Sequence, residues 1–185
     1  MSRSSAGAGG SELDVVIGDY PVAVAERAAH LGCPPPDGLT LLPINFLDAL
    51  STDEFVDDEF APDVRAAWRE AGVPESRLVD TGSRFRIRVG ESIPQWAHMT
   101  LFVGSLLLTQ NPAAVQVALG VLSSVLADLF KSRGMEGGVN LDVVVEQTKA
   151  KHSLKITYVG NLAGLDRLPD IINEVWNSGG RSRRQ

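Results

Sequence analysis

Three consecutive carboxylates, Asp57, Asp58 and Glu59, are the residues of this chain whose types are best suited to chemistry. Carboxylates bind divalent cations or act as general acids and bases, and His98 or His152 could supply the second group of an acid–base pair. Consecutive helical residues point about 100° apart, so three such side chains would not converge on one ion. The pattern favours a solvated acidic face. A small enzyme that uses these carboxylates with one of the two histidines is the alternative.

No nucleophile, metal or nucleotide motif accompanies the carboxylates. Cys33 is the single cysteine, so the chain can form neither an internal disulfide nor a thiolate cluster for zinc. None of the three histidines stands in a recognisable pairing motif with it. We therefore predict a non-enzymatic protein without a metal or another cofactor. The lone cysteine favours a reducing compartment and hence the cytoplasm.

A basic surface is predicted at Arg84, Arg86 and Arg88, which alternate with apolar residues. Strict alternation is typical of a β-strand and places the three guanidinium groups on one face, about 7 Å apart. Such a row could bind a phosphate or an acidic partner. The alternative is cross-strand pairing with carboxylates, for which Asp142 and Glu146 are candidates.

The elements that would position these groups are arranged around an apolar stretch at 92–127, which contains no lysine, arginine or acidic residue. Pro94 and Pro112 divide the stretch, and proline is best tolerated at the first position of a helix. We therefore predict two consecutive helices, at about 95–110 and 112–131. Together they would form an apolar helical hairpin.

The second predicted helix has one polar face, because its polar and small residues recur at intervals of three and four. The residues assigned to this stripe as a candidate self-association or membrane face are Gln116, Gly120, Ser123, Ser124 and Asp128. We expect the hairpin, about 94–131, to pack in a protein core or in the interface of a homo-oligomer. One reason is that a membrane span takes roughly 20 apolar residues, more than the first helix offers.

The alternative is a membrane-inserting effector that uses the same hairpin. Several copies would turn the polar stripe inward to line a pore, and the apolar side chains of the second helix would face lipid. The side chains that this hypothesis directs to the acyl chains are Leu119, Leu122, Leu126 and Phe130.

The rest of the chain predicts a small sheet. Alternation at 141–146 and 153–159 indicates a β-hairpin, and an amphipathic helix is expected at about 161–176. The predicted fold is α+β: a small antiparallel sheet of these two strands and 84–89, packed against the apolar helical hairpin and the C-terminal helix. We expect a disordered leader at 1–11, a single domain at 12–177 and a disordered basic tail at 178–185.

The charges do not favour a nucleic-acid partner. The formal net charge is −6, and residues 1–91 carry 16 Asp and Glu against 8 Lys and Arg, whereas 92–185 carry 7 against 9. Nucleic-acid binding proteins present a concentrated basic surface instead. A protein partner, or a second copy of the chain, is the predicted ligand.

The order strand, apolar helical pair, hairpin and helix resembles the small constant components encoded beside effectors in bacterial conflict systems. The likeness covers Arg84 to Trp176, about half of the chain, and rests on the layout of elements without a diagnostic motif. It implies an adaptor or regulatory subunit of an antiviral or effector system. It assigns a role to no individual residue.

Overall fold

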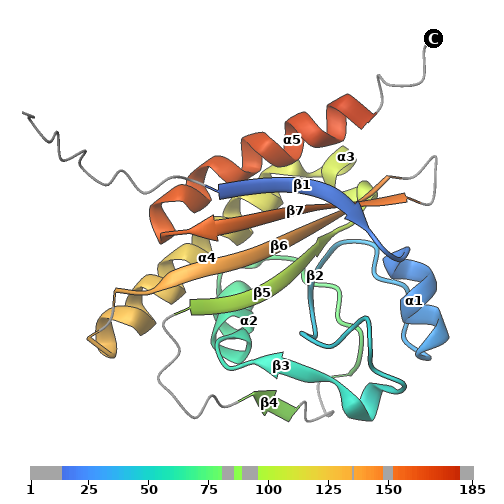
Figure 1. The fold of residues 1–185 in the computed structure, drawn as a ribbon, viewed down its shortest axis with the longest axis horizontal. Coiled ribbons are helices and arrows are strands. Elements are labelled where there is room, and N and C mark those ends of the chain that lie inside the picture. The colour runs from blue at the N-terminus through green and yellow to red at the C-terminus, as the bar shows by residue number, and fades with distance from the viewer. Residues whose placement is uncertain (1–13, 81–85, 89–95, 135, 148–151, 180–185) are drawn as a thin grey trace, which may run out of the picture.

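A five-stranded sheet with helices on one face and a smaller layer on the other forms the framework (Figure 1). The computed structural model describes residues 14–80, 86–88, 96–134, 136–147 and 152–179. The predicted leader at 1–11 and residues 180–185 of the predicted tail lie outside this part of the chain. The described strands are β1 (Asp14–Tyr20), β2 (Leu39–Leu42), β3 (Val56–Asp58), β4 (Arg86–Arg88), β5 (Trp96–Val103), β6 (Gly138–Gln147) and β7 (His152–Gly160). The described helices are α1 (Val24–His30), α2 (Ala61–Glu70), α3 (Ser105–Gln110), α4 (Pro112–Ser132) and α5 (Leu168–Gly179), with 3-10 turns η1 (Thr52–Glu54) and η2 (Leu162–Arg167).

The predicted α+β class is confirmed, but the sheet is mixed. Its strand order is β1-β7-β6-β5-β2, in which β5 and β6 run parallel and the other neighbours are antiparallel. The predicted hairpin is the β6–β7 pair. The arginine strand does not belong to this sheet, because β4 pairs with β3 in a separate two-stranded parallel sheet.

The prediction of a first helix in the apolar hairpin, at about 95–110, is wrong for most of that range. Residues 96–103 form β5, and only 105–110 are helical, as α3. β5 lies between β6 and β2. The C-terminal half of β5 is covered on both faces, because Leu101 packs in the hydrophobic core on one face of the sheet and Phe102 packs in a second core on the other face. A strand covered in this way is apolar on both sides and loses the alternation that distinguishes a strand from a buried helix.

The second predicted helix is present as α4, which closes the crossover between the parallel strands β5 and β6. A parallel pair requires such a connection. The apolar side of α4 packs on the sheet, and Leu119, Leu122 and Leu126 are at most 2% exposed. The Trp68 indole on α2 donates a hydrogen bond of 2.9 Å to the Ala118 carbonyl oxygen, which holds α2 against α4. α5, the predicted C-terminal helix, adds Ile172 to the same cluster.

A second, smaller core lies on the opposite face, at the end of the sheet where α1 sits (Figure 1). Phe102 and Val144 of the sheet meet Val24 of α1 and Phe46 of the loop that follows β2. Tyr20 at the end of β1 is 8% exposed and belongs to this cluster. The last residue of β1 is therefore anchored, whereas the preceding residues of the strand are mostly exposed.

Candidate functional site

The structure separates the predicted arginine site from the sheet. Arg84 lies outside the described residues, whereas Arg86 and Arg88 belong to β4, opposite Val56 and Asp58 of β3. Arg86 is exposed. Arg86 and Arg88 do not pair across strands with Asp142 or Glu146, because β4 and β6 belong to different sheets. A basic site on this strand remains a prediction that depends in part on residues beyond those described.

The polar stripe on α4 is brought together as one outward face. Gln116, Gly120, Ser124 and Asp128 are exposed, and Ser123 is half-buried beside η2. Ser123 Oγ donates a hydrogen bond of 3.5 Å to the Leu162 carbonyl oxygen of η2. The role of the stripe in self-association stays a prediction.

α4 is also the one helix in the described part of the chain that is long and apolar enough to cross a membrane. The side chains that the insertion hypothesis directs to lipid are instead buried against the sheet. Leu122 and Leu126 are fully buried, and Leu119 and Phe130 are each 2% exposed. Insertion would require α4 to leave the sheet and expose this core to solvent or lipid.

The three candidate carboxylates do not form a solvated acidic face, and each has its own neighbour. Asp57 is 2% exposed and pairs with Arg65 on α2. Glu59 pairs with Arg133 at 3.0 Å, between Nη1 and Oε2. The side chains therefore diverge instead of converging on one ion.

Of the three candidate carboxylates, Asp58 contacts the backbone of His98, one of the two histidines proposed above for an acid–base pair. Its Oδ1 accepts the Phe60 N–H at 2.9 Å, and its Oδ2 accepts the backbone N–H of His98 at 3.3 Å. Burial raises the pKa of Asp58, whereas these two hydrogen bonds oppose the rise. Both carboxylate oxygens thus accept hydrogen bonds from backbone N–H groups. These two hydrogen bonds connect the start of α2 to β5. The His152 side chain lies outside the described part of the chain.

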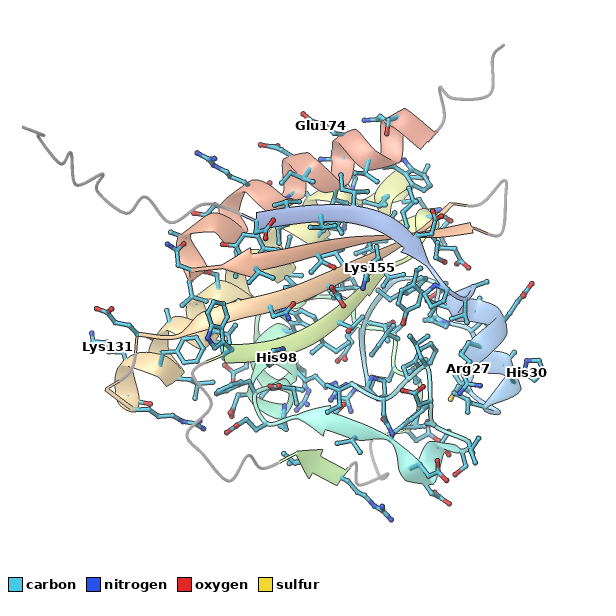
Figure 2. The ribbon with its side chains drawn as sticks, in the orientation of Figure 1. Arg27, His30, His98, Lys131, Lys155 and Glu174 are labelled. Atoms are coloured by element: carbon cyan, nitrogen blue, oxygen red, sulfur yellow. The ribbon has the colours of Figure 1, made fainter. Side chains whose placement is uncertain are left out.

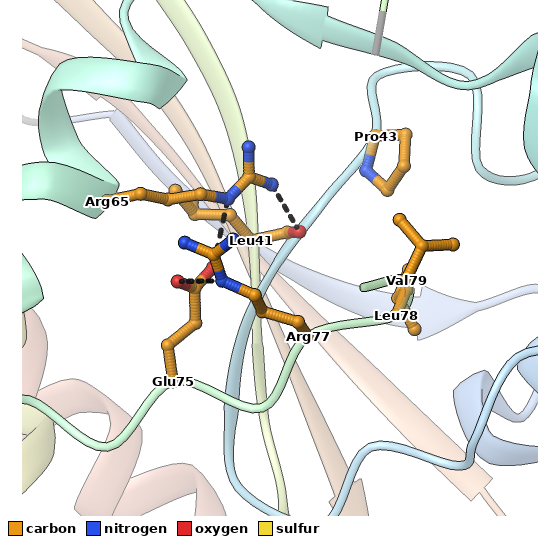
Figure 3. A pocket seen from close by; sticks show the side chains of 7 residues that line it. All are labelled: Leu41, Pro43, Arg65, Glu75, Arg77, Leu78 and Val79. Atoms are coloured by element: carbon orange, nitrogen blue, oxygen red, sulfur yellow. Dashed lines mark hydrogen bonds and ion pairs between the residues drawn. The ribbon is translucent and has the colours of Figure 1, made fainter. Parts of the chain in front are cut away.

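Arg65 sits at the centre of a buried ionic network that covers the outer edge of β2 (Figure 3). Its Nη1 donates to Asp57, and its Nε donates to Glu75 Oε1 at 3.0 Å. Its Nη2 donates to the Leu41 carbonyl oxygen of β2 at 3.2 Å. Burial lowers the pKa of Arg65, but the hydrogen bonds and charges of both carboxylates outweigh burial and leave it raised.

The loop that carries Glu75 covers the rest of that edge. Ser76 donates its backbone N–H to the Leu39 carbonyl oxygen at 2.7 Å, and its own carbonyl oxygen accepts the Thr40 hydroxyl at 2.7 Å. Glu75 also bridges to Leu39 as an isolated parallel pair. All four residues of β2 are buried. One edge of the sheet is therefore sealed by side chains and loop backbone.

A hollow beside this network, also lined by Pro43 and Val79, is too small for a substrate (Figure 3). Its volume is about 20 Å³, which accommodates about one water molecule. Ligand pockets typically measure hundreds of Å³. The Arg65 network thus serves the packing of the β2 edge.

The other edge of the sheet is open. β1 is the outermost strand and pairs with β7 over its whole length, from Asp14 opposite Val159 to Tyr20 opposite Ser153. Within the described part of the chain, no strand pairs with the outer side of β1. Figure 1 shows β1 at this edge. A strand at the edge of a sheet can pair with a strand of another chain.

The side chains of β1 make this edge apolar. Val16 is 57% exposed and Ile17 is 52% exposed, and as neighbours on a strand they point to opposite faces of the sheet. Natural edges are usually protected by lysine, proline, a bulge or very short length. The seven residues of β1 contain no lysine and no proline, and Asp14 and Asp19 are its only charged residues. Sequence reasoning found the strand but missed its position at the edge of the sheet.

No protein-family model matches this chain, no curated protein matches it, and no solved structure matches it.

Proposed function

We propose that this chain is a non-enzymatic protein-binding module, an adaptor or scaffold, that accepts an extended segment of its partner as an additional strand beside β1. The observation that carries the proposal is the contrast between the two edges of the sheet. Side chains and loop backbone seal β2, whereas β1 exposes Val16 and Ile17 and has no described strand beyond it. Strand addition to an exposed edge is a recurring mode of peptide recognition.

Strand addition has two parts that the β1 edge can supply. Main-chain hydrogen bonds provide affinity without a requirement for sequence, and alternate side chains provide specificity. Val16 and Ile17 would cover apolar side chains of the added strand on the two faces of the sheet. The anchored Tyr20 and the pairing with β7 keep this edge extended before the partner arrives, which lowers the entropic cost of binding.

Membership of a bacterial defence or effector system is the biological setting implied by the resemblance in element order. A binding module of this size suits the adaptor role in such a system. Assembly of several copies through the α4 stripe is compatible with strand addition, because α4 covers the face of the sheet and not the β1 edge.

Random-peptide phage display with the purified full chain tests the proposal. The test variant is Val16→Lys with Ile17→Lys, since lysine is the residue that natural edges use against strand pairing. Val117→Lys is the matched control, because Val117 is a 48% exposed valine on α4. We expect the selected peptides to bind the wild type and V117K and to lose binding to the double variant.

A second variant, Val16→Thr with Ile17→Thr, keeps β-branched side chains and guards against misfolding of the lysine variant. Circular dichroism verifies that each variant folds. The proposal is wrong if display enriches no peptide on the folded wild type, or if the enriched peptides bind both β1 variants as tightly as the wild type.

A further inference from the structure

We infer that the β1 edge also takes β1 of a second copy of this chain, so that two five-stranded sheets join across a two-fold axis. The inference rests on the proposed function and names one partner for the edge. A two-fold axis perpendicular to the sheet makes the two β1 strands antiparallel and keeps every side chain on its own face. Residues directly opposite each other are therefore an even number of positions apart in the sequence.

One register of this pair covers both exposed apolar residues of β1. It places Val16 opposite Val16 of the second copy, and it places Ile17 opposite Val15 twice in the dimer. Val16 and Ile17 are the large apolar residues of β1 that are more than half exposed. Val15 already packs against the core beneath α4 and α5, so Ile17 of the second copy would extend that core. Apolar pairs across strands stabilise a sheet.

The two neighbouring registers pair the edge less well. An axis through Ile17 would place Val15 opposite Asp19, and Asp14 opposite Tyr20, which is 8% exposed. An axis through Val15 would place Ile17 opposite a residue that precedes β1. The axis through Val16 pairs residues 14–18 with one another. Asp19 lies beyond these residues and keeps the interaction that it makes within its own chain.

The charges on the face of Val16 complement each other in this register. Asp14 lies opposite Gly18 of the second copy, and Gly18 lies opposite Lys155 of β7. A Cβ added to Gly18 would meet no atom within 4 Å, so open space separates the aspartate from the lysine. Neighbouring strands lie about 4.8 Å apart, so the two Cα atoms are about 10 Å apart. An extended lysine and an aspartate side chain together span about that distance.

Lys155 can contact this aspartate without leaving its own partner. Its Nζ lies 3.6 Å from Asp142 Oδ2, and 36% of its side chain is exposed. The ammonium group has three donors, which is enough for two carboxylates. Figure 2 shows Lys155 on the sheet, and its strand neighbour Val144 belongs to the core on the face away from α4. By symmetry the contact would occur twice in each dimer.

We expect this dimer to be weak. Two short strands bury little surface, and small interfaces are typical of transient complexes. Each copy also carries a formal net charge of −6, which opposes association. The dimer should therefore dissociate on dilution and leave the edge to a strand of another protein.

Disulfide cross-linking of the full chain tests the register. Val16→Cys places a thiol opposite its own copy, at a Cα separation of about 4.5–5.5 Å, which a disulfide spans. Ile17→Cys is the matched control, because Ile17 is equally exposed on the same strand but its copy lies two residues further along. That displacement sets the two Cα atoms about 8 Å apart, too far for a disulfide. Val117→Cys on α4 reports random collisions, and the native Cys33 is buried.

We expect a mild oxidant to convert Val16→Cys into a covalent dimer and to leave the two control variants largely monomeric on non-reducing gels. Sedimentation of the wild type should show a dimer that grows with concentration and is lost in Val16→Lys with Ile17→Lys. Asp14→Lys should raise the Kd about 2- to 30-fold, because it places two like charges near Lys155 of the other copy. Asp63→Lys, an exposed change on α2 with the same effect on net charge, should not raise it.

Three results would overturn the inference: a wild type that is monomeric at every concentration, a dimer that the β1 lysine variant leaves intact, or Val16→Cys that cross-links no faster than Ile17→Cys. The proposed function is judged separately by the display experiment, run below the Kd of the dimer. Selected peptides that require β1 on a monomeric chain would leave strand addition intact and reject only the second copy. A β1 dimer on which display enriches no peptide would keep the inference and reject the adaptor role.

Discussion

Replacement of Arg65 by alanine should destabilise the fold strongly, because it leaves two nearly buried carboxylates without their central cation. The side chain of Asp57 is 3% exposed and that of Glu75 is 9% exposed. Removal of one partner from a buried ion pair costs about 3–5 kcal/mol. The Leu41 carbonyl oxygen on the β2 edge would also lose its donor. For a domain of this size, the expected fall in Tm is about 6–20 °C.

Urea denaturation and thermal melts of the purified chain at neutral pH measure this loss. Arg69→Ala is the matched control, because Arg69 is exposed one turn further along α2 and the change in helix propensity is the same. We expect the control to change the free energy of unfolding by no more than about 0.5 kcal/mol. Adding Asp57→Asn to the Arg65→Ala variant should recover part of the loss, because it removes the unpaired buried charge.

The free energy of unfolding decides whether this interpretation is correct. If Arg65→Ala behaves like Arg69→Ala, the network does not hold the β2 edge. If the double variant is destabilised by the full sum of its single changes, the unpaired carboxylate is not the cause of the loss.

Three further predictions concern packing and pH. Gly104→Ala should destabilise the fold, because an added Cβ would lie 2.7 Å from the Asp37 carbonyl carbon, whereas Gly120→Ala on the exposed side of α4 should stabilise it by up to about 1 kcal/mol. Urea denaturation of both variants tests this, and equal effects would contradict it. Leu122→Ala should cost about 2–5 kcal/mol in the same assay, because Leu122 is fully buried between α4 and the sheet; a loss below 1 kcal/mol would show that α4 does not pack there. Burial raises the pKa of Tyr20 to about 12, so its contribution to stability is complete below pH 10 and is lost as the pH rises toward 12. Over that range the wild type should lose about 2 kcal/mol more stability than Tyr20→Phe, and parallel pH profiles would contradict this prediction.

Local patterns in the sequence were sufficient for the elements whose two faces differ in polarity along most of their length. Alternation at 141–146 and 153–159 predicted the β6–β7 hairpin, and Pro112 with the polar stripe predicted the amphipathic helix α4. Both elements separate polar from apolar residues at the period of their own backbone. The α+β class followed from these elements.

The same reasoning failed at 96–103, where it predicted a helix in place of β5. Helices and loops cover both faces of the inner half of this strand, so Leu101 and Phe102 are both fully buried although they point in opposite directions. A strand with two covered faces carries no polar period. Its type is decided by the strands β6 and β2 that pair with it, and these are distant in the sequence.

The candidate site also depended on tertiary structure. The residues 13–17 predicted a strand, and their sequence contains Val16 and Ile17, which are exposed in the structure. Whether such a strand is central or at an edge depends on which other segments pair with it, and no local pattern records that choice. The order β1-β7-β6-β5-β2 placed β1 at one edge, and the contacts of Arg65 and Ser76 sealed the other. Sequence determined the apolar and acidic character of β1, and long-range strand pairing decided that this character lies on an open edge.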